Sequence, residues 1–181
     1  MKKLLCIALS LVMLLAFAAC GAEKEDSTEA KEATGLLSSF TAETLDGKKA
    51  DQSIFDGKKV TMVNIWATFC GPCRASMPDL QKLHKDYKKD GFQVVGIVCD
   101  VYSHNGVYDS TSLTTAKEIV KETGVSYKVL LPSDDLNRIK LNSVSSVPET
   151  FFVDENGAVI AGPFIGSRSY EDWAMIIEGI L

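Results

Sequence analysis

The chain has 181 residues, a formal net charge of −5 and a mean hydropathy of +0.07. This acidic balance argues against nucleic acid as a partner, because a nucleic-acid-binding surface needs an excess of positive charge. The length suits a single globular domain with a sizeable core, accompanied by terminal segments.

The first 19 residues have the pattern of an export signal. Residues 2–3 are lysines, and residues 4–17 form an apolar stretch with one serine. The small residues 18–19 then precede Cys20, which resembles the lipobox of bacterial lipoproteins, although Phe17 stands where leucine is usual. This resemblance implies cleavage before Cys20 and diacylation of Cys20. Two acyl chains would anchor the chain stably to the outer face of the bacterial cytoplasmic membrane. An ordinary signal peptide and an uncleaved anchor are the alternatives, and each places the protein outside the cytoplasm.

Residues 20–35 are expected to form a lipidated tether. Acidic residues and lysines dominate this segment without apolar periodicity, so it cannot bury enough surface to become ordered. Loss of residues 1–19 removes two lysines and no acid, which leaves 17 basic and 24 acidic residues and a formal charge of −7. The globular domain is expected over residues 36–181.

The first elements of this domain are predicted to be a hairpin and a central strand. Residues 40–44 and 48–50 flank Leu45-Asp46-Gly47, whose Asp-Gly pair favours a tight turn. Residues 60–67 then form an apolar run, which predicts a buried strand.

Two cysteines, Cys70 and Cys73, follow this strand where a helix begins. Apolar residues at helical spacing from Arg74 onward predict the helix, and Gly91 ends the pattern. The N–H groups and dipole at a helix N-terminus stabilise a thiolate, so Cys70 is predicted to be the nucleophile. Cys73 lies one turn later and is predicted to be the resolving thiol.

Two other interpretations of this cysteine pair are open. Half of a zinc site would need a second ligand pair, but the remaining cysteines and histidines are scattered singly: Cys6, Cys20, Cys99, His84 and His104. An inert structural disulfide would stabilise most by closing a long loop, and this pair closes almost none. Thiol redox chemistry is the preferred interpretation, with no metal and no separate cofactor.

The rest of the chain alternates between strands and helices. The predicted elements are a strand at 94–99, a polar loop at 100–114, a helix at 115–123, a strand at 127–131, a helix at 134–141, a strand at 147–153, a strand at 159–164 and a last helix capped by Ser169. This order indicates an α/β protein with a mixed central sheet flanked by helices.

Several motifs resemble the thioredoxin fold and, within it, the TlpA/ResA group of membrane-tethered extracytoplasmic thiol-disulfide oxidoreductases. The matching segments are 63–73 (VNIWATFCGPC), Met77-Pro78, 147–154 (VPETFFVD) and Gly157. The resemblance covers about residues 36–181. Residues 115–131 correspond to the helix-strand insertion that is typical of this group.

The resemblance implies a particular site and a particular set of partners. It implies a cis Val147-Pro148 bond packed against the dithiol, with the backbone of Val147 pairing to an extended client segment. The implied substrate-binding residues are Trp66, Phe69, Gly71, Pro72, Val147 and Pro148. It also implies a CcdA-like membrane electron donor and clients such as apocytochrome c or a surface methionine sulfoxide reductase. The protein itself is expected to be a monomer.

Proton handling at Cys73 departs from the family pattern. Asn64 stands where cytosolic thioredoxins have a buried acid, and Ser76 stands where ResA-like proteins commonly have a glutamate. Glu149, directly after the proline, is a candidate proton acceptor, and a solvated strand residue is the preferred alternative.

Three further residues have ambiguous roles. Cys99 ends an apolar strand and is expected to be an inert core thiol, with a third redox cysteine near the active face as the alternative. His84 and His104 are isolated in the sequence and are expected to be solvated.

The combined pattern predicts a reductase of disulfides or of equivalent oxidised sulfur in exported proteins. A disulfide-forming oxidase of the same fold is one alternative, and a redox-sensing or ligand-binding lipoprotein without enzymatic activity is the other.

Overall fold

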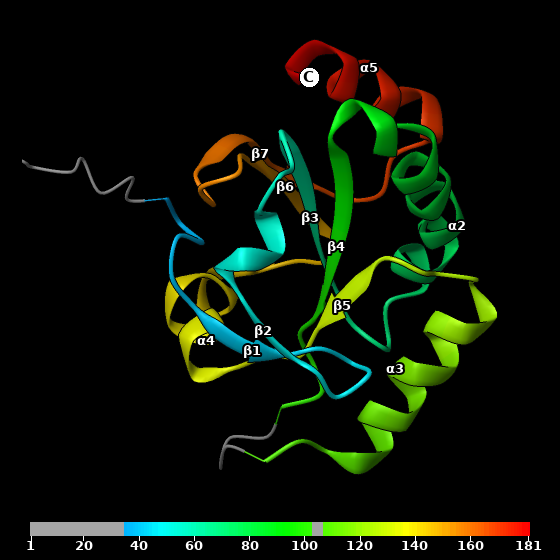
Figure 1. The fold of residues 1–181 in the computed structure, drawn as a ribbon. Helices are drawn as coiled ribbons and strands as arrows, with labels where there is room; N and C mark the ends of the chain where they lie inside the picture. The colour runs from blue at the N-terminus through cyan, green and yellow to red at the C-terminus, as the bar shows by residue number, and fades with distance from the viewer. Residues whose placement is uncertain (1–34, 103–106) are drawn as a thin grey trace, which may run out of the picture. The chain divides into compact units, whose positions relative to one another are not determined.

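The computed structural model describes residues 35–102 and 107–181 (Figure 1). The expected signal peptide, Cys20, most of the tether and His104 lie outside the described residues.

A five-stranded mixed sheet lies at the centre of the fold, in the order β5-β4-β3-β6-β7. β3 is parallel to β4 and β4 is parallel to β5, whereas β6 is antiparallel to both β3 and β7. The strand bounds are β3 Val60–Trp66, β4 Phe92–Val98, β5 Lys128–Leu130, β6 Glu149–Val153 and β7 Val159–Ile165. The prediction of a mixed sheet is therefore confirmed.

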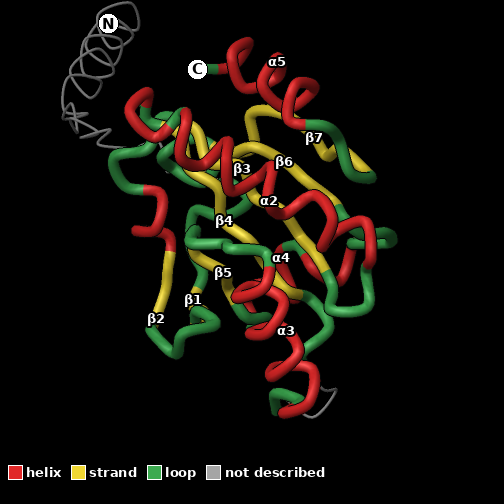
Figure 2. Tube along the Cα trace, turned by 90° about the vertical axis from the view of Figure 1, so that its right-hand side faces the viewer, coloured by secondary structure: helices red, strands yellow, loops and turns green. Residues whose placement is uncertain are grey.

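Helices cover both faces of this sheet. The α-helices are α2 Gly71–Asp86, α3 Ser110–Glu122, α4 Asp134–Ile139 and α5 Tyr170–Ile180, and the short 3-10 helices are η1 Gln52–Phe55, η2 Lys88–Asp90 and η3 Leu141–Ser143. α2 and α5 lie on one side of the sheet and α4 on the other (Figure 1). Figure 2 looks onto the side that carries α2, α3 and α5.

The alternation of side chains along β3 divides the core into two clusters. All seven residues of β3 are buried. Met62 and Trp66 belong to the cluster beneath α2, α3 and α5, whereas Val63 and Ile65 belong to the cluster on the α4 side. Successive strand side chains point to opposite faces, so an uninterrupted apolar run is what a sheet covered on both faces requires.

A separate hairpin shields one edge of the central sheet. It consists of β1 Thr41–Glu43 and β2 Lys49–Asp51. The Leu45 N–H donates to the Val129 carbonyl at 2.8 Å, and the Leu131 N–H donates to the Glu43 carbonyl at 2.8 Å. The predicted hairpin is confirmed, and it covers polar groups of β5 that would otherwise form an open edge.

Several element boundaries differ from the sequence predictions because side-chain caps decide them. α2 begins at Gly71 with Cys70 as its N-cap, so the predicted placement of the dithiol at a helix start is confirmed. α3 begins at Ser110, well before residue 115, because the Asp109 carboxylate accepts from the Ser112 N–H at 2.7 Å. The segment predicted as one helix over 134–141 is instead divided between α4 and η3.

Candidate active site

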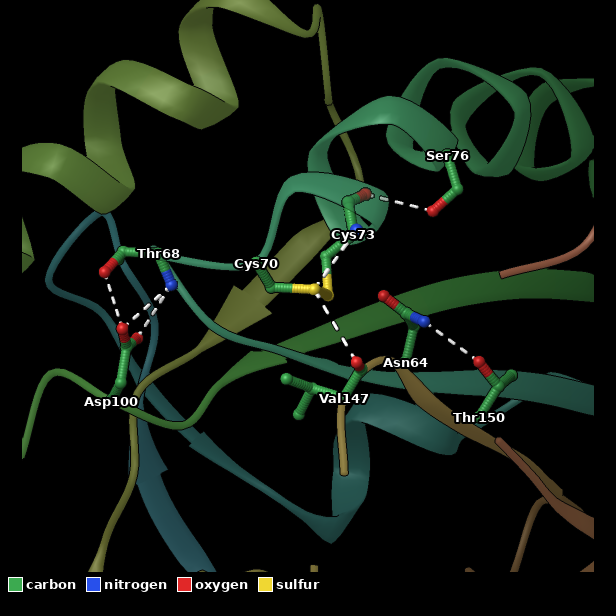
Figure 3. Close-up of a disulfide and its surroundings, with 8 residues drawn as sticks. All are labelled: Asn64, Thr68, Cys70, Cys73, Ser76, Asp100, Val147 and Thr150. Atoms are coloured by element: carbon green, nitrogen blue, oxygen red, sulfur yellow. Dashed lines mark hydrogen bonds between the residues drawn. A yellow bond between two sulfur atoms is a disulfide. The ribbon is translucent and has the colours of Figure 1, made fainter. Parts of the chain in front are cut away.

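Cys70 and Cys73 form a disulfide where β3 passes into α2 (Figure 3). Their sulfur atoms are 2.02 Å apart and their Cα atoms 5.3 Å apart. Cys70 is the N-cap residue of α2, and its Sγ accepts from the Cys73 N–H at 3.2 Å. Because this N–H is one of the unpaired donors of the helix start, the same contact would stabilise a Cys70 thiolate.

The two cysteines differ in how far they reach the surface. Cys70 is 6 % exposed and Cys73 is 1 % exposed. Cys70 is therefore the more accessible of two largely buried cysteines. This asymmetry agrees with the predicted division into a nucleophile and a resolving thiol.

Val147 and Pro148 lie against the disulfide from the other side of the site. The Val147-Pro148 peptide bond is cis, as the resemblance implied, and the Val147 carbonyl oxygen is 3.7 Å from Cys70 Sγ (Figure 3). The Gly166 N–H donates to the Pro148 carbonyl at 2.9 Å, so the end of β7 holds this segment in place. A second cis bond, Gly162-Pro163, was not predicted from the sequence.

Neutral hydrogen-bonding groups occupy the positions where the family pattern has acids. Asn64 is buried, and its Nδ2 donates to Thr150 Oγ1 at 2.9 Å. The Ser76 hydroxyl donates to the Cys73 carbonyl at 3.0 Å (Figure 3). Neither side chain can take up the Cys73 proton as a carboxylate would.

Glu149 is not a solvated strand residue, and that expectation was wrong. It is 3 % exposed, and its carboxylate forms an ion pair with Lys140, whose side chain is largely buried. Glu149 shares the α4 side of β6 with Phe151, whose ring centroid lies 5.7 Å from the Lys140 ammonium. Cys73 belongs to the cluster on the opposite side of the sheet. The geometry therefore gives no support to Glu149 as the proton acceptor for Cys73. A buried carboxylate needs a compensating charge, and Lys140 supplies it.

The implied substrate-binding residues divide into exposed and buried groups. Phe69 is 79 % exposed, and Gly71 and Pro72 are also exposed beside Cys70. Trp66 is 0 % exposed, so its side chain cannot touch a client, and its assignment to substrate binding is corrected. The reason is its position on β3, where the indole points into the core beneath α2.

Sequence reasoning missed a contact between Thr68 and Asp100. The Asp100 carboxylate accepts from the Thr68 N–H at 2.9 and 3.0 Å and from the Thr68 hydroxyl at 2.5 Å (Figure 3). Asp100 follows the carboxyl end of β4, the sheet edge at which functional groups of α/β proteins gather. That position was the only signal available in the sequence.

Cys99 is half-buried and not a good nucleophile at neutral pH. Burial, together with the nearby Asp100 carboxylate, raises the pKa of the Cys99 thiol to about 11. Its backbone N–H donates to the Trp66 carbonyl at 2.9 Å, so its main-chain role is to tie β4 to β3. These facts favour the inert thiol over the third redox cysteine, although the side chain is less buried than a core position would predict.

His84 is half-buried and hydrogen-bonded, so the expectation of a solvated histidine was wrong. Its Nδ1 accepts from the Val94 N–H at 3.0 Å. Burial lowers the pKa of His84, and the nearby ammonium groups of Lys88, Lys58 and Lys85 lower it further. The neutral imidazole therefore has a structural role, because it joins α2 to β4.

The fold and the site together define a thioredoxin-fold protein with a Cys-x-x-Cys pair at the start of a helix and a cis-proline beside it. The chain belongs to the Redoxin family, which residues 28–164 match. This membership, together with the relatives below, confirms the resemblance to the thioredoxin superfamily and to its ResA-like members.

Individual relatives point to the same group. "Thiol-disulfide oxidoreductase ResA" of Oceanobacillus iheyensis is 31% identical over 119 residues, which cover 65% of this chain and 55% of that protein. The protein of the same name from Bacillus cereus strain ZK is 29% identical over 160 residues, covering 88% of this chain and 80% of the relative. The chain thus spans little more than half the length of the Oceanobacillus relative. A crystal structure of a thioredoxin-family thiol:disulfide interchange protein from Chlorobium tepidum has a TM-score of 0.64 and 29% identity, covering 78% of this chain and 92% of that one.

Proposed function

We propose that this protein is a thiol-disulfide oxidoreductase that reduces disulfides, or equivalent oxidised sulfur, in exported proteins. The observation that carries the proposal is the placement of the cysteine pair. Cys70, the more exposed of the two buried cysteines, lies next to the exposed Phe69 and against the cis Val147-Pro148 segment, whereas Cys73 is more deeply buried. The names of the ResA relatives support the same class of reaction.

The reaction consists of two exchanges. The Cys70 thiolate attacks one sulfur of a client disulfide, so that a Cys70–client disulfide forms and the other client sulfur leaves as a thiolate, which takes a proton from water. Cys73 then attacks Cys70 Sγ, which forms the Cys70–Cys73 disulfide and breaks the Cys70–client bond, and the released client thiolate takes up the proton that Cys73 loses. Two electrons pass from the protein dithiol to the client disulfide.

Local charges favour a moderately stabilised thiolate. The Cys73 N–H and the helix start stabilise the Cys70 sulfur. Arg74 is the charged neighbour on α2, but its guanidinium already pairs with Glu122 at 3.2 Å. A potential of about −270 to −220 mV, towards the reducing end of the range for this fold, is therefore proposed, whereas the oxidase alternative would require a value near −120 mV.

The test is a pair of single substitutions. Cys70→Ser should abolish insulin reduction by the dithiothreitol-reduced protein, because the thiol that attacks the client disulfide is lost. Cys73→Ser should instead accumulate mixed disulfides with clients in cells, because only the resolving step is lost. Cys99→Ser serves as the matched control and should behave as the wild type.

Two outcomes would count against a reductase. One is a folded, abundant Cys73→Ser protein that traps no partner. The other is a wild-type protein that does not accelerate insulin reduction, which would favour the redox-sensing or binding alternative.

The proposal extends to location and partners. Within residues 35–102 and 107–181, no helix is both long and apolar enough to cross a membrane. We propose anchoring through a diacylated Cys20 at the outer face of the cytoplasmic membrane. A reductase outside the cytoplasm needs a membrane electron donor, for which a CcdA-like protein is proposed, with apocytochrome c or a surface methionine sulfoxide reductase as clients.

A further inference from the structure

The segment that presents the reactive sulfur is held by an acid just beyond the end of a neighbouring strand, β4. We propose that Asp100 is a positioning residue, which fixes the connector of residues 67–70 so that Cys70 and Phe69 face an incoming client. This inference rests on the proposed thiol-disulfide exchange. Asp100 acts through Thr68, because its hydrogen bonds in Figure 3 go to the connector and not to the disulfide.

The connector joins the last residue of β3 to the first residue of α2. Its start is tied to β4, because the Cys99 N–H donates to the Trp66 carbonyl at 2.9 Å. Its middle is tied to the same strand end by the Asp100 carboxylate, which accepts from both the N–H and the hydroxyl of Thr68. Its last residue, Cys70, donates its N–H to the Ala67 carbonyl at 3.1 Å. Each half of the connector therefore has a defined conformation.

The exposure pattern shows what this restraint achieves. Ala67 and Cys70 are buried, Thr68 is half-buried, and Phe69 between them is 79 % exposed. An aromatic ring next to a buried core would gain free energy by turning inward. Hydrogen bonds from a carboxylate to a backbone N–H and a hydroxyl are charge-assisted and stronger than neutral ones. They hold Thr68, and so keep the neighbouring Phe69 ring turned towards the surface and Cys70 in place at the start of α2.

A positional role and an electrostatic role of Asp100 predict opposite results. Thiol-disulfide exchange requires the attacking sulfur to line up with the disulfide under attack, and a displacement of about 1 Å can cost about a hundredfold in rate. Loss of the restraint should therefore slow the reaction. If instead the charge of Asp100 mattered by opposing the Cys70 thiolate, its removal would increase the thiolate fraction and speed the reaction.

The test compares Asp100→Asn, Thr68→Val and Asp154→Asn in the full chain. Asp100→Asn keeps the shape of the side chain but removes its charge, and Thr68→Val removes only the hydroxyl donor. Asp154→Asn is the matched control, because Asp154 also accepts from two backbone N–H groups, at 2.8 and 2.9 Å, but lies in the β6–β7 turn at the other end of β6 from Pro148.

Two rates are measured on each reduced protein. The single-turnover rate of insulin reduction depends on the alignment of Cys70 with a large client, whereas the pH profile of alkylation by iodoacetamide reports the thiolate. We expect Asp100→Asn to slow insulin reduction about tenfold or more, Thr68→Val to slow it less, and Asp154→Asn to stay within about twofold of the wild type. The pH profiles of alkylation should coincide.

An Asp100→Asn protein as fast as the Asp154→Asn control, or faster than the wild type, would overturn the inference. A slow Asp100→Asn protein whose alkylation profile shifts to higher pH would also overturn it, because the loss would then come from the thiolate. If Asp100→Asn does not fold, Thr68→Val decides by the same criteria. A folded wild type that reduces no insulin would refute the proposed function itself, and this inference with it.

Discussion

At the residue scale, several polar side chains at the site and along α2 act by pairing with the backbone. Asp100 holds the N–H of Thr68, and the Ser76 hydroxyl donates to the Cys73 carbonyl. His84 in α2 accepts the N–H of Val94 and so ties the end of this helix to β4. Such bonds are costly to lose, because the remaining buried partner is left without a substitute.

The hydrogen bond of His84 predicts a pH dependence of stability. The pKa of His84 in the folded protein is lowered from its ordinary value of 6.5, so the unfolded chain binds the proton more readily than the folded one. The contribution of His84 to stability is therefore complete above about pH 6.5 and is lost as the pH falls below that value. Urea unfolding of the wild type between pH 8 and pH 5 should show this loss.

A His84→Gln variant is the control for this prediction. Glutamine can still offer an acceptor but does not titrate, so its stability should depend less on pH below 6.5. Equal pH dependence in the two proteins would mean that His84 is not the responsible group.

At the element scale, a buried ion pair joins β6 to the junction between α4 and η3. Lys140 lies between these two helices, and Glu149 is the first residue of β6, directly after the cis-proline. The pair therefore links the strand that follows the cis Val147-Pro148 segment to the helical layer on the α4 side of the sheet.

Breaking this pair should be more harmful than replacing it. Glu149→Gln should lower the free energy of unfolding by about 3–5 kcal/mol, because it leaves the Lys140 ammonium without its counter-charge. Glu149→Leu combined with Lys140→Met should recover most of this loss, since apolar side chains of similar size suit a buried site. Urea unfolding of the single and double variants measures both effects.

The same variants also test the correction of the proton-acceptor role. The double variant should retain the wild-type pH profile of insulin reduction, because neither side chain lies on the Cys73 side of the sheet. If the double variant lost the alkaline or acidic limb of that profile, Glu149 would have to be reconsidered as the proton acceptor for Cys73.

At the scale of the whole molecule, the sheet order brings distant segments into one site. Residues 70–73 follow β3, Val147-Pro148 precedes β6, and Gly166 follows β7, and these three strands are neighbours in the sheet. The antiparallel pairing of β6 with β3 places the start of β6 beside the end of β3, next to the disulfide.

The proposed export signal and lipid anchor predict how the protein is held in the cell. Cys20→Ala should release the chain from the membrane fraction, because diacylation needs that thiol and residues 21–35 offer no apolar anchor. Cell fractionation with an antibody measures the release, and mass spectrometry of the mature N-terminus identifies the cleavage site. Cys6→Ala, in the apolar stretch of the signal, is the matched control and should stay membrane-bound. Retention of the Cys20→Ala chain with residues 1–19 still attached would instead indicate an uncleaved anchor.

Local patterns in the sequence were enough to predict most of the helices and strands and the position of the cysteine pair. The run at β3, the Asp-Gly turn and the cap of α5 were all predicted, and the Ser169 hydroxyl indeed accepts from the Asp172 N–H at 3.1 Å. Spacing alone placed Cys70 and Cys73 at a helix start, because strand and helix periods act over a few residues.

Only the tertiary structure decided which groups meet across the fold. The burial of Trp66, the pairing of Glu149 with Lys140 and the contact of Asp100 with Thr68 each depend on which layer covers a given face of the sheet. A period of two shows that neighbouring strand residues point to opposite faces of the sheet, but it does not show which helix or loop packs against each face. The sequence by itself therefore determined the reactive dithiol and the elements around it, while the packing of segments far apart in the chain decided what holds that dithiol in place.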